Sequence, residues 1–113
     1  MDLGVLYYRR GNRKDAKRYF ELATQVNPRF ALALNNLGYL LAEEGKLDEA
    51  LILCSRASEL EETSQNVDSL GYVYLRMGQR EKARTLIARA LELDPNNREA
   101  KEHWAELAGL EAE

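Results

Sequence analysis

One phrase occurs three times in this chain of 113 residues: a leucine and a glycine, six further residues, and a second glycine. The copies read LGVLYYRRG, LGYLLAEEG and LGYVYLRMG. Their first glycines, Gly4, Gly38 and Gly71, are 34 and 33 residues apart. The second glycines keep the same spacing, at Gly11, Gly45 and Gly78. A fixed period of this length indicates a repeat architecture, in which each unit buries its apolar face against its neighbours.

The apolar spacing within each period is helical. In the second period, small and apolar residues recur at three- and four-residue steps, at Leu34, Leu37, Gly38 and Leu41. This stripe predicts a helix that ends where Gly45 adopts left-handed backbone. A second stripe follows at Leu47, Ala50, Leu51, Cys54, Ala57 and Ser58. Each period is therefore predicted to be a helical hairpin, whose first glycine allows close packing against Ala16, Ala50 or Ala83 of the second helix.

These residues resemble the tetratricopeptide repeat family, whose 34-residue pattern is tryptophan-x2-leucine-glycine-x2-tyrosine, then alanine-x3-phenylalanine, then proline. The first unit matches at Leu3, Gly4, Tyr7, Ala16, Phe20 and Pro28. The second matches at Leu37, Gly38, Ala50 and Ala57, and the third at Leu70, Gly71, Tyr74, Ala83, Ala90 and Pro95. Other pattern positions hold apolar substitutes, such as Cys54 for phenylalanine. The resemblance covers residues 1 to about 97.

The resemblance implies an all-α fold: a right-handed superhelical stack of three antiparallel helix hairpins plus a C-terminal capping helix. We expect one domain over residues 1–113, divided into repeats at about 1–30, 31–63 and 64–97 and a cap at about 98–110. The inward side of the cap is expected to carry Ala100, Trp104, Leu107 and Ala108. The first helix is about one turn short, which favours a fragment of a longer array over a natural start.

The sequence offers little for catalysis. Its single histidine, His103, and single cysteine, Cys54, are expected on different elements, whereas a nucleophile and its base must converge. Cys54 occupies a core position and His103 is expected at the surface. No phosphate-binding loop or metal-ligand spacing is present. We therefore expect no enzymatic activity, no cofactor and no metal.

Charge and hydropathy limit the classes of partner that this chain is expected to bind. The net charge of −3 has the wrong sign for a surface that tracks nucleic-acid phosphates. No apolar run approaches the length of a membrane span. We expect a cytoplasmic protein, although a removed secretory leader is left open. Basic side chains gather around the first interhelical turn, at Arg9, Arg10, Arg13, Lys14, Lys17 and Arg18. Their cluster is interpreted as solvated surface, with docking of an acidic partner as the sharper alternative.

What remains is a binding module. By resemblance to the family, the first helices of the hairpins line a concave groove that holds an extended peptide or a helix of a partner protein. The candidate groove residues are Tyr8, Arg9, Asn35, Asn36, Tyr39, Gln65, Asp68, Ser69, Tyr72 and Arg76, with Val5 beside them. Amides both donate to and accept from a peptide backbone, and tyrosine adds apolar area with a polar tip.

One subfamily is excluded. Chaperone-tail binders in this family grip a terminal carboxylate with two lysines, two asparagines and an arginine, and of these only Asn36 has a counterpart here. Met1, Val5, Gln65 and Ser69 occupy the other places. The predicted function is thus a protein interaction module with an unidentified protein or peptide partner. The alternative is a structural module that self-associates through its open N-terminal edge or its charged ends.

Overall fold

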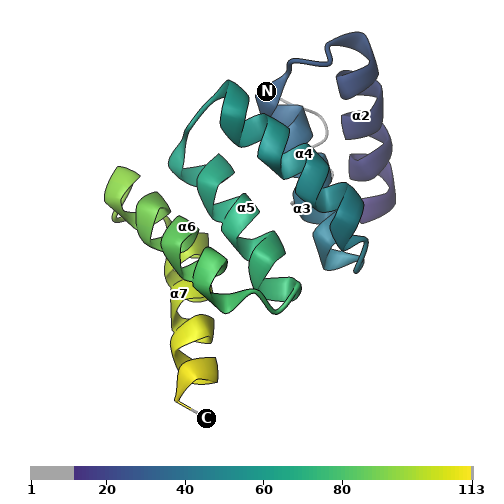
Figure 1. The fold of residues 1–113 in the computed structure, drawn as a ribbon. Helices are drawn as coiled ribbons and strands as arrows, with labels where there is room; N and C mark the ends of the chain where they lie inside the picture. Colours follow the sequence, from purple (N-terminus) through teal and green to yellow (C-terminus); the bar gives the residue numbers. More distant parts are fainter. Residues whose placement is uncertain (1–11, 113) are drawn as a thin grey trace.

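The computed structural model describes residues 12–112, and Figure 1 shows that helices dominate this part. The described residues contain six α-helices and no strand. The helices are α2 (Arg13–Val26), α3 (Ala31–Glu43), α4 (Leu47–Leu60), α5 (Ser64–Arg76), α6 (Arg80–Leu93) and α7 (Arg98–Glu111). They form a helical repeat solenoid in which α3 pairs with α4 and α5 with α6, so the predicted all-α class is confirmed. The helix expected before α2 lies outside the described residues.

The two hairpins turn in the same way. Gly45 and Gly78 have φ angles of 84° and 82°, in the left-handed region that a side chain would strain. Immediately after Gly45, the backbone N–H of Lys46 donates to the carbonyl of Leu41 at 2.9 Å. This six-residue closure satisfies a carbonyl that the helix end leaves open. The prediction for Gly45 is confirmed.

The first glycine of each hairpin lies where the paired helices touch. A Cβ added at Gly38 would lie 2.5 Å from Cys54 Sγ, and one at Gly71 would lie 2.8 Å from Ile87 Cγ1. Real Cβ atoms do not approach other heavy atoms so closely. The close packing is therefore as predicted, but the nearest side chains are Cys54 and Ile87 rather than the alanines.

The core lies between the helices in two buried clusters. The first joins α2, α3 and α4 and includes Tyr72 and Val73 of α5. The second joins α5, α6 and α7. Because α5 contributes to both clusters, it joins the α3–α4 hairpin to α6 and α7.

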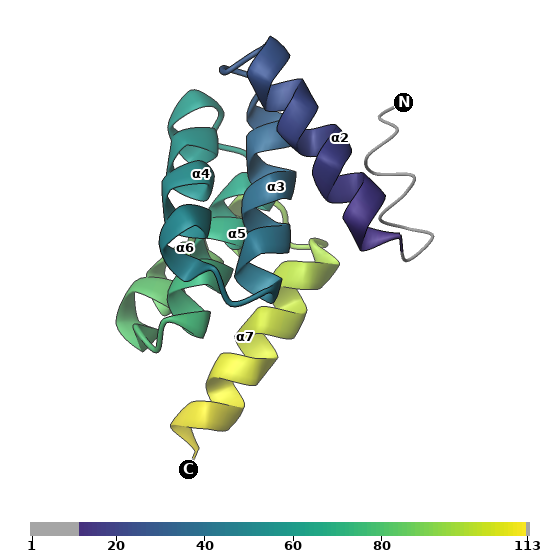
Figure 2. The same ribbon diagram turned by 90° about the vertical axis from the view of Figure 1, so that its right-hand side faces the viewer.

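Helix α7 packs on α5 and α6, and its C-terminal end projects beyond the other helices (Figures 1 and 2). Ala100 and Leu107 are buried as predicted. The expectations for Trp104 and Ala108 were wrong, because Trp104 is 39% exposed and Ala108 is also exposed. His103, one residue before Trp104, turns inward instead and is 6% exposed. It is a buried residue and not the surface residue predicted.

Candidate functional site

A pocket of about 450 Å³ lies over α3 and α5, with the first turn of α7 at its margin. Six predicted groove residues line it: Asn35, Asn36, Tyr39, Gln65, Asp68 and Ser69. Four other residues that sequence reasoning did not select also line it: Phe20, Leu32, Asn97 and Glu99. The described lining thus combines an apolar part, several amides and two carboxylates.

The amides of Asn35 and Asn36 are incompletely satisfied. Asn35 is 1% exposed, yet its Oδ1 has no hydrogen-bond partner within residues 12–112. Its neighbour Asn36 is half-buried, and its Nδ2 likewise has no partner in this part of the chain. A buried polar atom left without a partner costs about 1–3 kcal/mol. An adjacent acceptor and donor of this kind can accept from one peptide N–H and donate to one peptide carbonyl.

The margin of the pocket is held by an amide and a hydroxyl. Asn97 caps α7 by accepting the backbone N–H of Ala100 at 3.2 Å, while its Nδ2 donates to Ser64 Oγ at 2.9 Å. Ser64 in turn donates to the carbonyl of Ala90 at 2.7 Å. This chain of hydrogen bonds ties the starts of α5 and α7 to α6.

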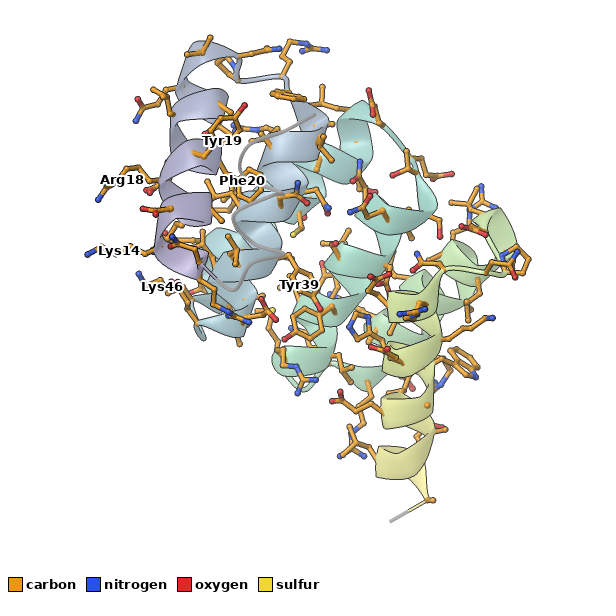
Figure 3. All side chains as sticks on the ribbon, turned by 180° about the vertical axis from the view of Figure 1, so that it is seen from behind. Lys14, Arg18, Tyr19, Phe20, Tyr39 and Lys46 are labelled. Atoms are coloured by element: carbon orange, nitrogen blue, oxygen red, sulfur yellow. The ribbon has the colours of Figure 1, made fainter. Side chains whose placement is uncertain are left out.

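Three rings form a continuous stack beside the pocket. The rings of Tyr39 and Tyr72 are stacked with centroids 4.6 Å apart, and Tyr72 stacks on His103 at 4.8 Å. Figure 3 shows Tyr39 on the side of α3 that faces α5 and α7. Burial raises the pKa of the Tyr72 hydroxyl above its ordinary value. The two tyrosines, both predicted as groove residues, therefore contact each other, and Tyr72 is part of the core.

His103 connects this stack to the pocket. Its Nδ1 lies 3.0 Å from each carboxylate oxygen of Asp68, and its Nε2 lies 3.4 Å from the Tyr39 hydroxyl. Because a carboxylate only accepts, the Nδ1–H donates to Asp68. One histidine on α7 thus contacts one pocket residue on α5 and another on α3.

Arg76 lies outside the pocket. Its guanidinium is 4.9 Å from the centre of the Tyr72 ring and donates to both carboxylate oxygens of Glu106 on α7. Burial alone would lower the pKa of Arg76, but the hydrogen bonds and charge of Glu106 outweigh it and raise that pKa. Neither Arg76 nor Tyr72 is among the described residues that line the pocket. Tyr8, Arg9 and Val5 lie outside the described residues.

The basic cluster on α2 is partly neutralised by the next hairpin. Arg13 pairs with Glu43 at 3.2 Å, and Lys17 pairs with Glu44 at 3.0 Å. Figure 3 shows the side chains of Lys14 and Arg18 pointing outward from α2, away from the other helices. The remaining members, Arg9 and Arg10, precede the described part of the chain.

Three further features of residues 12–112 concern the single cysteine, metal-ligating side chains and membrane-spanning helices. Cys54 is fully buried, and burial raises the pKa of its thiol to about 12, which keeps it protonated and unreactive. No group of three or more metal-ligating side chains occurs in this part. None of the described helices has both the length and the apolar character needed to cross a membrane.

One signal could have found His103. Asn36 precedes Gly38 by two residues, and Ser69 precedes Gly71 by two. Continuing the period by 34 residues from Gly71 reaches position 105, and His103 precedes it by two. Helix α7 therefore continues the register of the pocket-lining helices α3 and α5. The prediction of a capping helix did not include this register, so His103 was not selected.

Comparison with known proteins gives the family. Two tetratricopeptide repeat profiles match, one over residues 1–65 and the other over residues 41–107. A TPR repeat-containing protein of Methanocaldococcus jannaschii is 44% identical over 48 residues, which are 42% of this chain and 8% of that relative. The chain therefore spans only a small part of that relative's length.

Two solved structures are similar over most of the chain. The first TPR of Spaghetti (RPAP3), bound to the HSP90 peptide SRMEEVD, has a TM-score of 0.81 and 22% identity, over 97% of this chain and 88% of that one. YrrB, described as a TPR protein with an unusual peptide-binding site, has a TM-score of 0.75 and 28% identity, over 88% of this chain and 52% of that one. With both halves of the sequence matched by its profiles, the chain belongs to the tetratricopeptide repeat family.

Proposed function

We propose that this protein is an interaction module that holds an extended peptide of a partner protein in the pocket over α3 and α5. One observation carries the proposal: the Oδ1 of Asn35 and the Nδ2 of its sequence neighbour Asn36 are buried without a hydrogen-bond partner in residues 12–112, and both residues line a pocket of about 450 Å³. An extended peptide brings a donor and an acceptor at every residue. Binding would satisfy both asparagine atoms at once.

The relatives support the same class of function. Spaghetti (RPAP3) was solved with a bound peptide, and YrrB is described by its peptide-binding site. Leu32 and Phe20 add apolar surface at the α2–α3 end of the pocket. The polar and apolar parts together suit a peptide that carries an apolar side chain next to the backbone held by the amides.

The test uses a displayed library of random peptides as the probe. Wild-type protein is expected to enrich a peptide family, and Asn35→Leu should weaken the best of these peptides at least tenfold. The matched control is Gln25→Leu, the same change on the exposed side of α2. It should bind as the wild type does. A library that yields no peptide, or peptides that bind equally to the wild type and Asn35→Leu, would contradict the proposal.

A second candidate, self-association, is favoured by the exposed side chains of Leu22 and Val26 at the C-terminal end of α2. The N-terminal edge that it would also use lies outside the described residues. Sedimentation over a wide concentration range tests it. A rise in mass that Leu22→Lys abolishes would support this candidate, and a constant monomer mass would exclude it.

A further inference from the structure

The buried carboxylate of Asp68 accepts few hydrogen bonds for a charged group. It lines the pocket, and its side chain is 3% exposed. A carboxylate offers about four acceptor sites. Within residues 12–112, its hydrogen bonds come only from His103 Nδ1. Buried carboxylates are normally paired or accept several hydrogen bonds, so this one has unused acceptor capacity toward the pocket.

The rest of the described lining gives the pocket a negative character. Glu99 at the start of α7 adds a second carboxylate, and no lysine or arginine is among the lining residues that the structure describes. Arg76 is occupied by Glu106 and the Tyr72 ring. Among the described residues, no lysine or arginine pairs with the carboxylate of Asp68. A cation brought by a ligand would supply a counter-charge.

His103 determines how Asp68 is presented. Its Nδ1–H holds both carboxylate oxygens, its Nε2 meets the Tyr39 hydroxyl, and its ring is stacked on Tyr72. These contacts come from α5 and α3, so the imidazole cannot rotate without breaking them. The orientation of the Asp68 carboxylate thus depends on the docking of α7.

We propose that the pocket selects a basic side chain, lysine or arginine, in the bound peptide, with Asp68 as its counter-charge and His103 as the positioning residue. This inference rests on the proposed peptide-binding function and names its ligand chemistry. The unpartnered Asn35 Oδ1 nearby is independent evidence that the pocket is built to receive donors. Asn35 and Asn36 hold the peptide backbone, while Asp68 reads one side chain.

The first test compares matched peptides. The displayed library should return peptides that share one lysine or arginine. For a selected lysine peptide, replacing that lysine by norleucine keeps the aliphatic chain and removes the charge. The replacement should cost wild-type protein at least tenfold in affinity and cost Asp68→Asn less than threefold. Equal losses in both proteins, or selected peptides with no shared basic residue, would overturn the inference. The latter peptides would still support peptide binding if they depended on Asn35, so the two failures are distinguishable.

The second test addresses His103. His103→Phe keeps a ring against Tyr72 and removes both nitrogens. It should reduce the preference for lysine over norleucine below threefold while changing affinity for the norleucine peptide less than twofold. A purely structural role would weaken both peptides equally. His103→Asn, which retains a donor near the Nδ1 position, should recover part of the preference and covers the case in which the phenylalanine variant does not fold.

The single histidine also gives a direct spectroscopic readout. In the ¹⁵N spectrum, the Nδ1 signal of His103 should shift when the lysine peptide binds. A signal unchanged by the lysine peptide would overturn the proposal.

Discussion

The two faces of α3 differ in almost every property. The face against α4 carries Leu34, Leu37 and Gly38, which are buried, and leaves no room for even one added carbon at Gly38. The face toward α5 and α7 carries Asn35 and Asn36, each with one amide atom that has no hydrogen-bond partner within residues 12–112. The first face stabilises the hairpin. The second keeps unsatisfied polar atoms that cost stability, which is expected of a surface that binds something.

The aromatic stack of Tyr39, Tyr72 and His103 lies beside the pocket and stabilises the fold. Tyr72→Ala removes a buried ring and its contacts with Tyr39 and His103, so we expect a loss of about 3 kcal/mol in unfolding free energy. Denaturant unfolding measures it. Tyr74→Ala, on the same helix with a half-buried ring, is the control and should cost less. An equal or greater loss for the control would show that the stack contributes little.

The face of α3 that packs against α4 should not tolerate a larger side chain. Gly38→Leu would force the backbones of α3 and α4 apart, because the first added carbon already meets Cys54 Sγ, and we expect a loss of about 2–3 kcal/mol. Gly109 of α7 is the control, since an added Cβ meets nothing within 4 Å there. Gly109→Ala should raise stability by about 0.5–1 kcal/mol. Thermal melting distinguishes the opposite signs, and a stable Gly38→Leu variant would disprove the tight interface.

On the face of α3 that carries Asn35 and Asn36, a substitution should raise stability and lower peptide affinity. Asn35→Leu removes a buried atom that has no partner in the described part of the chain, so we expect the unfolding free energy to rise by about 1 kcal/mol while peptide affinity falls. Chemical denaturation and titration with a library-selected peptide give the two quantities. A variant that loses stability and binding together would indicate that Asn35 supports the fold.

The smallest effect is expected where α2 meets the turn between α3 and α4. The hydrogen bond from Lys17 lowers the pKa of Glu44, and the one to Glu44 raises the pKa of Lys17. The pair is partly exposed, so a double-mutant cycle should give about 0.5 kcal/mol.

The pH dependence of this pair follows from the two shifts. A lowered carboxyl pKa stabilises the folded state above the ordinary pKa of glutamate, 4.5, and this contribution is lost as the pH falls through the folded value. The raised lysine pKa preserves the contribution until the pH exceeds 10.5. The coupling energy should thus be constant from about pH 5 to 10 and vanish in acid. A coupling that persists at pH 2 would contradict the ion pair.

Much of the fold could be predicted from the sequence, because its determinants are local and periodic. The glycine at the end of α3 and the apolar stripes depend on neighbours three or four residues away. Pocket residues such as Asn35 and Asp68 could be selected because they share an offset in successive helices. The contact between Tyr39 and Tyr72 could not, because it depends on side-chain directions across two helices. The inward turn of His103, and with it the exposure of Trp104, depends on how α7 docks.

The central claim is that the groove face of α3 and α5 binds the peptide. The most direct test is a ¹H–¹⁵N titration of the protein with the best peptide from the displayed library, followed through the backbone amide, side-chain amide and imidazole signals. The largest shifts should occur at the Asn35 and Asn36 amides and at His103, with little change at Gln25 or Gln79. Shifts concentrated on α4 and α6, with the Asn35 and Asn36 signals unmoved, would contradict it.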